Sequence, residues 1–449
     1  GTTTKKKYMA DYRKSLTLLE SLIGKATAAG ANAADAVFME SISLSLVQRL
    51  GEREHLARSE SAELGLRVFL GARQAIVSSS DASAPALDEL VERAVAMARS
   101  VPEDPFCGLA DADQLATDFP DLEGCDEQEP DADTLSERAT QAEDAARAVP
   151  GVTNSEGAEA SWGRSSIAVA STNGFSQSRS GSRHSISVSV LAGEGSEMER
   201  DYDYVTTVHG DDLPPPADIG RSAGEKTVNR LNPKKATSAS VPVVYDPRVA
   251  NSLVRHLAGA VNGTAVARGT TFLKDKIGEQ IFPAATTIVD DPLRPRGLGS
   301  KSFDGEGVGT KRLDIIEAGV LTSWILDLRS ARQLGLSTTG HAGRGISSPP
   351  SPSTTNLYLQ AGDVTPKELM SDIKAGLYIT EMMGFGVNTI TGDYSRGASG
   401  FWIENGELAY PVNEVTIAGN LEHMFSHLTA ADDLEFRYAT NSPTLRIEG

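Results

Sequence analysis

His423 and His427 have the spacing of a metal-binding pair. They stand four residues apart in the segment His423-Met424-Phe425-Ser426-His427, which would place both imidazoles on one face of a helix. A zinc peptidase helix also needs a glutamate directly after its first histidine, as the base for the bound water. Met424 holds that position. The pair therefore indicates an exposed helix face, with a peptidase site of non-standard composition as the alternative.

Three glycine-rich runs have the backbone freedom that close approach to a ligand requires. They span residues 297–299, 305–309 and 340–345. None contains the G-x-x-x-x-G-K-[ST] loop that cradles phosphate, and none lies between a predicted strand and a helix. Plain turns are the favoured interpretation, because glycine is the usual turn residue. Pairing of an extended peptide with a sheet edge is the alternative.

No nucleophile has surroundings that would activate it. The segment 392–397 lacks the G-x-S-x-G spacing of a serine hydrolase. Cys107 and Cys125 lie in acidic stretches, which raise the pKa of a thiol instead of lowering it. Two cysteines without a C-x-x-C pair indicate reduced, incidental thiols.

Neighbouring carboxylates are the remaining catalytic candidates. The pairs are Asp290 with Asp291, and Asp304 with Glu306. Such pairs can serve a hydrolase, but acidic side chains in loops are more often solvated or bonded to backbone amides. From residue chemistry we assign no catalytic, cofactor-binding or metal-binding residue, and peptide binding is the activity left open.

Charge and hydropathy narrow the class of protein. The formal net charge of −19 over 449 residues argues against binding to nucleic acid, which needs clustered Lys and Arg. No stretch approaches the roughly 18 continuous apolar residues of a membrane span. The residues after Lys5, Lys6 and Lys7 are polar, so no secretory signal is expected. These features predict a soluble, cytoplasmic protein.

The elements that must position these residues are helices and antiparallel strands in separate blocks. Helical periodicity covers residues 8–29, 84–100, 134–148, 219–231 and 247–261. Strand patterns cover residues 37–39, 44–47, 64–69, 165–171, 185–190 and 241–245, with hairpin turns at Gly51, Gly71 and Asn173-Gly174. Brief helices are expected near Ala331 and Thr365, and residues 101–133 indicate a surface connection.

This arrangement predicts an α+β fold, because the β-α-β-α alternation of a doubly wound sheet is missing. We predict an N-terminal α+β domain over residues 1–110 and a middle α+β domain with antiparallel strands over residues 111–235. A large, glycine-rich, mixed β domain with few helices is expected over residues 236–449. Pro233 ends the helix before the last boundary, and Asp246 is expected to cap the helix that follows it.

Longer patterns lie from residue 241 onward. They are residues 303–308 (FDGEGV), 330–340 (SARQLGLSTTG), 392–407 (GDYSRGASGFWIENGE) and 410–421 (YPVNEVTIAGNL). Together with helix 246–261, this ordered set resembles the PmbA/TldE branch of the TldD/PmbA metallopeptidase family, whose older label is modulator of DNA gyrase. The resemblance extends over nearly the whole chain and is most specific from residue 241 onward.

The resemblance implies a subunit of a two-protein peptidase. In this family, TldD-type chains carry H-E-x-x-x-H on a helix and bind zinc, whereas PmbA-type chains associate with them and help to form the chamber that holds the peptide. The complexes trim peptides, including microcin-type peptides, and degrade small unfolded proteins. The expected partners are therefore a TldD-type zinc subunit and extended peptides, with a homodimer when the chain is alone. Neither nucleic acid nor a membrane is expected as a partner.

His256 marks the departure from the zinc-binding members. If His256 takes the first motif position, Leu257 stands where the glutamate base belongs and Val261 stands where the second histidine belongs. Neither side chain can bind zinc or activate water. Residues 439–446 also lack the cysteine that TldD-type chains supply. The resemblance thus implies no cofactor in this chain and zinc in the partner, and His256 is expected to be a core or interface histidine.

Three functions follow from these observations. The leading one is a chain that contributes architecture and holds extended peptides by β-strand addition, while its partner supplies catalysis. The second is a self-sufficient peptidase with a site around His423 and His427. The third is an acidic regulatory protein that binds gyrase-related factors.

Overall fold

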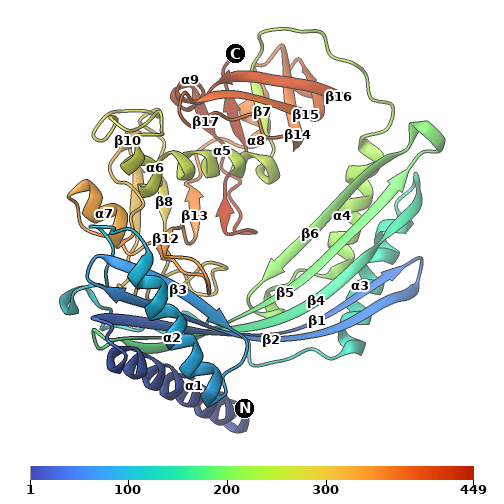
Figure 1. The fold of residues 1–449 in the computed structure, drawn as a ribbon. Coiled ribbons are helices and arrows are strands. Elements are labelled where there is room, and N and C mark those ends of the chain that lie inside the picture. The colour runs from blue at the N-terminus through green and yellow to red at the C-terminus, as the bar shows by residue number, and fades with distance from the viewer. Residues whose placement is uncertain (1) are drawn as a thin grey trace.

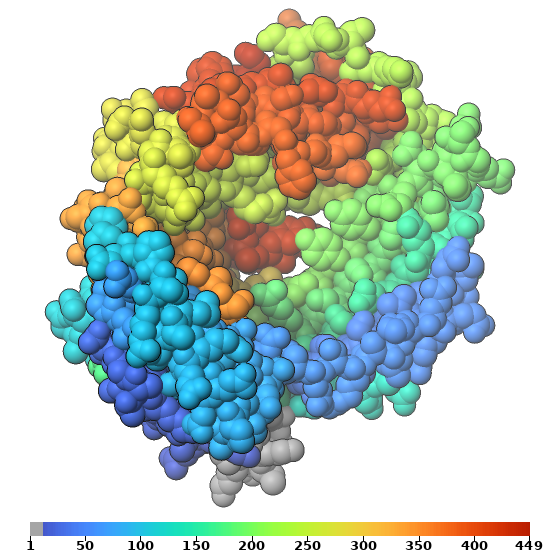
Figure 2. Space-filling view, viewed as in Figure 1, coloured from blue at the N-terminus to red at the C-terminus, as the bar shows by residue number. Residues whose placement is uncertain are grey.

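A long antiparallel sheet in the N-terminal half sets the shape of the molecule. The computed structural model describes the backbone of residues 2–449 and the side chains from Tyr12 onward. Figure 1 shows the sheet along one side and the C-terminal elements along the other. The space-filling view shows a central opening between them (Figure 2). Ion pairs close this ring at both ends of the sheet, with Arg344 to Asp35 at 2.7 Å and Arg248 to Asp201 at 2.9 Å.

The sheet has the strand order β3-β2-β1-β4-β5-β6, and all neighbouring pairs are antiparallel. The strands are β1 (Ala33–Arg49), β2 (Glu52–Leu70), β3 (Arg73–Ser79), β4 (Val152–Ser171), β5 (Ser176–Ala192) and β6 (Glu199–Thr207). Gly51, Gly71 and Gly174 lie at the hairpin turns with positive φ, as their sequence positions predict.

Four of these strands are longer than their apolar patterns indicate. The predicted runs 37–39 and 44–47 belong to one strand, β1, because the polar residues between them are also paired. Ser41, for example, lies opposite Ser61 of β2 and Ser165 of β4. Such long strands support two separate helical layers on one face.

Helices cover the outer face of the sheet in two pairs (Figure 1). They are α1 (Thr2–Ala28) and α2 (Ala84–Ser100) over one half, and α3 (Ala132–Ala148) and α4 (Pro216–Asn229) over the other. The second pair packs closely through small residues, because a Cβ on Gly220 would lie 1.9 Å from the Ala142 carbonyl oxygen. The opposite face of the sheet carries none of the described helices and faces the C-terminal half (Figure 1).

The C-terminal half surrounds helix α5 (Pro247–Ala260), which Asp246 caps by accepting a hydrogen bond from the Arg248 amide. The other helices are short: α6 (Gly263–Arg268), α7 (Leu328–Leu334), α8 (Pro366–Met370) and α9 (Leu421–Ser426). The largest hydrophobic core includes Leu253, Leu257 and Val261 together with residues of the surrounding strands.

Two mixed sheets and one two-stranded ladder make up the strands of this half. The first sheet is β10-β9-β8-β13-β18 and the second is β16-β15-β14-β7-β19-β17. Their bounds are β7 (Val243–Tyr245), β8 (Ile288–Asp290), β9 (Leu313–Glu317), β10 (Val320–Leu321), β13 (Leu357–Leu359), β14 (Ala375–Met383), β15 (Asp393–Glu404), β16 (Glu407–Asn420), β17 (Leu428–Ala430), β18 (Thr440–Asn441) and β19 (Leu445–Ile447), and the ladder joins β11 (Ala342–Gly343) to β12 (Ser351–Pro352). The pairs β14/β7 and β13/β18 are parallel, which makes both sheets mixed.

The predicted α+β class is confirmed, with an antiparallel N-terminal block and a mixed β block that contains few long helices. The three-domain division stays a prediction. One continuous sheet takes β1, β2 and β3 from residues 1–110 and β4, β5 and β6 from residues 111–235. None of the helices within residues 2–449 is both long and apolar enough to span a membrane.

The connection between α2 and α3 attaches the sheet to the C-terminal half. Arg332 of α7 donates hydrogen bonds to the carbonyl oxygens of Phe106, Gly108 and Leu109. Ala110 is buried in the same contact. A segment predicted as a surface connection from its composition therefore also forms part of the ring.

Candidate functional site

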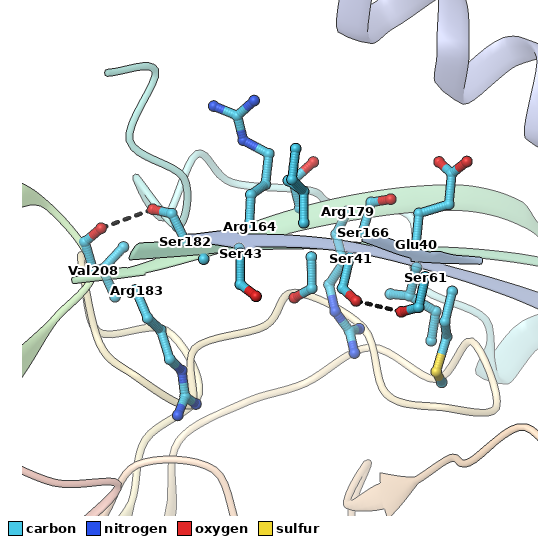
Figure 3. A pocket seen from close by; sticks show the side chains of 18 of the residues that line it. Glu40, Ser41, Ser43, Ser61, Arg164, Ser166, Arg179, Ser182, Arg183 and Val208 are labelled. Carbon is cyan, nitrogen blue, oxygen red and sulfur yellow. Dashed lines mark hydrogen bonds between the residues drawn. The ribbon is translucent and has the colours of Figure 1, made fainter. Parts of the chain in front are cut away.

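Small side chains line the inner face of the sheet, which faces the C-terminal half. Ser41 and Ser43 of β1 alternate with residues of the outer face, and register places Ser61 and Ser165 beside Ser41 and Gly163 beside Ser43. We call Ser41, Ser43, Ser61, Ser165, Gly163 and Gly181 the serine floor. The Ser41 and Ser61 hydroxyls lie 2.6 Å apart (Figure 3). They bond to each other and not to a base, so this pair lacks the activation that a serine nucleophile needs.

A cavity of about 700 Å3 lies above the serine floor. Its opposite wall comes from the C-terminal half, namely Gly297, Leu298, Ser300, Arg344 and Ile346. Short side chains let another backbone approach the sheet closely, and hydroxyls offer both donors and acceptors. This volume falls within the range of known ligand pockets.

Charged residues border the cavity on opposite sides. One row across four strands runs from Glu63 of β2 through Met39 and Ile167 to Arg179 of β5. The Arg179 guanidinium donates to the Phe303 carbonyl oxygen at 2.6 Å, and its centre lies 4.8 Å from the Phe303 ring. Burial lowers the pKa of Arg179 to about 10, so the group remains a cation at neutral pH. The cavity is thus acidic at one end of this row and basic at the other.

A buried ion-pair triad fixes the same cavity wall. Asp35 of β1 accepts two hydrogen bonds from Arg67 of β2 and two from Arg344. All three side chains are less than 5% exposed. Burial alone would raise the pKa of Asp35, but the charges of Arg344 and Arg67 hold it well below its usual value. The carboxylate therefore links the sheet to the C-terminal half.

Asp304 and Glu306 are buried beside this triad. Asp304 accepts hydrogen bonds from the amides of Glu306, Val308 and Ala342, and Glu306 accepts one from the Leu328 amide. Burial and the neighbouring Asp304 raise the pKa of Glu306 to about 8. The sequence predicts such bonding to backbone amides for this pair. Both carboxyls therefore have a structural role in the loops that they join.

Replacement of Glu306 by glutamine is expected to flatten the pH dependence of stability. Because the pKa of Glu306 is raised in the fold, the folded state keeps a proton that the unfolded chain releases. Stability should then fall as pH rises from about 4.5 to about 8, by up to about 1.4 kcal/mol per pH unit. Urea unfolding across this range measures the slope.

The exposed Glu89 of α2 supplies the control for this slope. Glu89→Gln should keep the wild-type pH dependence, whereas the slope of Glu306→Gln should be shallower. Equal slopes for the wild type and Glu306→Gln would show that Glu306 is already ionised at neutral pH.

The three positions where the sequence resemblance would place a zinc motif lie on α5 and at the residue that caps its C-terminal end. Leu257 is 1% exposed and Val261 is fully buried, both in the largest hydrophobic core. His256 is partly buried and its ring meets the Tyr394 ring edge-on at 5.9 Å. Burial and the charges of Arg396 and Arg255 lower the pKa of His256 to about 4. These residues do not fit a zinc ion, since two of the three are core hydrocarbons.

His423 and His427 lie at the exposed end of α9. The helix ends at Ser426, so His427 occupies the cap and its Nδ1 lies 2.8 Å from the His423 carbonyl oxygen and 2.8 Å from the Ser426 hydroxyl. The two rings stack with centroids 4.1 Å apart. Within residues 12–449, no group of three His, Cys, Asp or Glu side chains is placed to hold a metal ion.

The remaining sequence candidates have structural partners. Asp290 is fully buried and accepts hydrogen bonds from the Thr355 amide and hydroxyl, with His341 Nε2 at 2.8 Å. Asp291 accepts a hydrogen bond from the Leu293 amide. Burial raises the pKa of both thiols, and Asp104 adds to the effect at Cys107, in the direction the sequence predicts.

Two of the glycine-rich runs serve turns and close packing. Gly307 and Gly340 have positive φ, and a Cβ on Gly305 would lie 2.5 Å from the Arg344 Cβ. These glycines let the 303–309 loop pack against residues 340–344. The serine floor itself was missed, although the alternation of serine with Ile186, Val188 and Val190 in β5 is a signal for a polar inner face.

Comparison with known proteins gives matches over most of the chain. Three family models match in order: PmbA/TldA metallopeptidase domain 1 at residues 34–98, the central domain at residues 125–231 and the C-terminal domain at residues 238–449. The metalloprotease PmbA of Escherichia coli is 39% identical, over 94% of this chain and 91% of its own. A PmbA homologue of Haemophilus influenzae is 40% identical, over 92% of this chain and 90% of its own.

Solved structures share the same fold. A Bacteroides thetaiotaomicron protein described as a modulator of DNA gyrase superposes with a TM-score of 0.89 at 26% identity, over 96% of this chain and 97% of that one. TldE from Thermococcus kodakarensis superposes with a TM-score of 0.85 at 20% identity, over 96% of this chain and 98% of that one. At this identity the similarity shows the fold alone.

Proposed function

Because this chain belongs to the PmbA/TldD family of metallopeptidases, we propose that it is the subunit of a two-protein zinc peptidase that holds the peptide and does not cleave it. The observation that carries this proposal is the packing of α5. Leu257 and Val261, at the motif positions of a base and a zinc ligand, lie in the hydrophobic core. Zinc and its activated water would then come from a TldD-type partner.

The serine floor supports a role in holding extended peptides. Its short side chains allow close approach of a peptide backbone, and its hydroxyls can bond to peptide groups without selecting a side chain. The outer edge of β2 from Glu52 to Glu63 supports strand addition as well, since β3 pairs with β2 only from Leu64 onward. These edge residues are mostly exposed, which leaves their backbone groups accessible to another strand.

The biological setting is part of the same proposal. We place the complex in the cytoplasm, where it would trim peptides of the microcin type and degrade small unfolded proteins. The chain alone would form a homodimer. Neither nucleic acid nor a membrane would be a partner, in keeping with the net charge of −19.

The test compares the chain alone with the chain purified together with a TldD-type partner. Zinc analysis should give no stoichiometric metal for the chain alone and zinc in the heteromer, and only the heteromer should cleave an unstructured peptide. Stoichiometric zinc together with peptide cleavage in the chain alone would refute the proposal.

A substitution in the serine floor tests whether this surface holds the peptide or only supports the assembly. Ser41→Trp should lower cleavage by the heteromer without preventing its assembly, because the indole fills space above the floor. Ser100→Trp, at the exposed end of α2, is the matched control. Unchanged cleavage with Ser41→Trp would leave the chain a purely architectural role.

A further inference from the structure

Two arginines of the C-terminal half, Arg255 of α5 and Arg396 of β15, form no ion pair with any carboxylate of residues 12–449. Arg248 of the same helix is paired with Asp201 at 2.9 Å, and Arg230, which contacts Ser399 of β15, is paired with Glu381 at 2.6 Å. Arg255 and Arg396 are distinguished by lying close to each other, so that two cations without a carboxylate partner among the described residues share one place.

Arg396 contacts the neutral side chains of Met382 and Tyr394 and no carboxylate among the described side chains. Its Nη1 lies 3.9 Å from the Met382 sulfur, and the Tyr394 hydroxyl lies 3.5 Å from the same sulfur. Its Nε is buried without a hydrogen-bond partner. A thioether is a weak acceptor, so the contact with Met382 does not compensate a guanidinium as a carboxylate would.

Arg255, Arg396 and His256 are close enough to affect one another. Partial burial and the Arg396 charge lower the pKa of Arg255. Burial, and then the charges of both arginines, lower the pKa of His256. The imidazole is therefore neutral at pH 7, and its buried Nε2 has no partner. Two neighbouring cations without an anion repel each other, and a bound anion would remove that cost.

The surroundings of Arg255 make it accessible to a ligand. Its side chain is exposed although α5 is otherwise largely buried, and Figure 1 places α5 beside the central opening. Tyr204 and Tyr438, whose rings are 5.4 Å apart, lie near Arg255. The exposed guanidinium of Arg255 therefore lies where an anionic group in the central opening could reach it.

We propose that Arg255 and Arg396 bind the C-terminal carboxylate of a peptide held in the central opening. A guanidinium presents paired donors that match a carboxylate in geometry and charge. That the carboxylate belongs to a peptide rests on the proposed function, whereas carboxylate binding is a property of this chain alone. Such a site would set the direction in which a peptide lies across the molecule.

Calorimetric titration of the full chain without a partner tests the assignment. The probes are N-acetyl-trialanine with a free carboxylate, its C-terminal amide, and an amide in which glutamate replaces the middle alanine. The acid should bind at millimolar concentration or better. Both amides should bind at least about tenfold more weakly, the factor expected for loss of one charge-assisted hydrogen bond.

Variants locate the site. Arg255→Gln, at an exposed position, should lower the affinity for the acid about tenfold and leave the amide unaffected. Arg396→Lys keeps the charge but not the paired donors, so it should also lower the affinity for the acid. Arg99→Gln, on the exposed face of α2, should bind as the wild type does. Thermal unfolding of each variant checks that the fold is intact.

Four results would overturn the proposal: equal binding of acid and amide, binding of the glutamate amide as tight as that of the acid, unchanged affinity in Arg255→Gln, or no binding at millimolar concentration. None of these depends on whether the chain associates with a zinc subunit. Failure of the carboxylate site and failure of the proposed function are therefore distinguishable.

Discussion

Replacement of Asp35 by alanine is expected to lower the free energy of unfolding by about 3–5 kcal/mol, the usual cost of leaving a buried charge uncompensated. Asp35 is 1% exposed and is the shared partner of Arg67 and Arg344. Its removal would leave two buried guanidinium groups side by side. Since Arg344 belongs to the C-terminal half, the same change would also remove one of the contacts that hold the sheet to that half. Urea unfolding followed by circular dichroism measures the loss.

A surface ion pair provides the control for Asp35. Asp88 forms a pair with Lys25 at 2.9 Å, but its side chain is 68% exposed. Asp88→Ala should therefore change the free energy of unfolding by less than about 1 kcal/mol. A loss of similar size in the two variants would mean that the Asp35 triad is hydrated and contributes no more than a surface pair.

Local patterns in the sequence were sufficient for most helices and for the fold class. Helix α2 begins and ends at the predicted residues, because its apolar positions recur at helical spacing and Pro85 lies in its first turn. Strand lengths were underestimated, since the polar residues between the apolar runs of β1 are held by their neighbours across the sheet. That pairing is a tertiary effect, and periodicity within one strand does not contain it.

The candidate site was predictable only in part, for a related reason. The motif positions Leu257 and Val261 were identified from residue types and resemblance, and the structure adds that they belong to the core. The Asp35 triad joins residues 32 and 309 positions apart, so no local pattern reveals it. The serine floor likewise exists only once β1, β2 and β4 are aligned in register.

Replacement of Leu257 by glutamate is expected to cost about 3–5 kcal/mol of stability, because it places an unpaired charge in the largest core. The carboxylate would have neither a metal nor a hydrogen-bonding partner in the core that Leu257 shares with Leu253 and Val254. Adding Val261→His should not create a zinc site, since both positions are filled by hydrocarbon packing. Urea unfolding and zinc analysis of the single and double variants test this.

Leu257→Met separates the effect of charge from that of shape. It keeps the volume nearly unchanged and should cost less than about 1.5 kcal/mol. If Leu257→Glu were as stable as Leu257→Met, and the double variant bound zinc, Leu257 and Val261 would face a hydrated pocket that needs only new side chains for catalysis. The expected loss means instead that conversion to a zinc-binding chain requires repacking of the core around α5. The packing around α5, and not the identity of two residues alone, then separates this chain from a zinc-binding one.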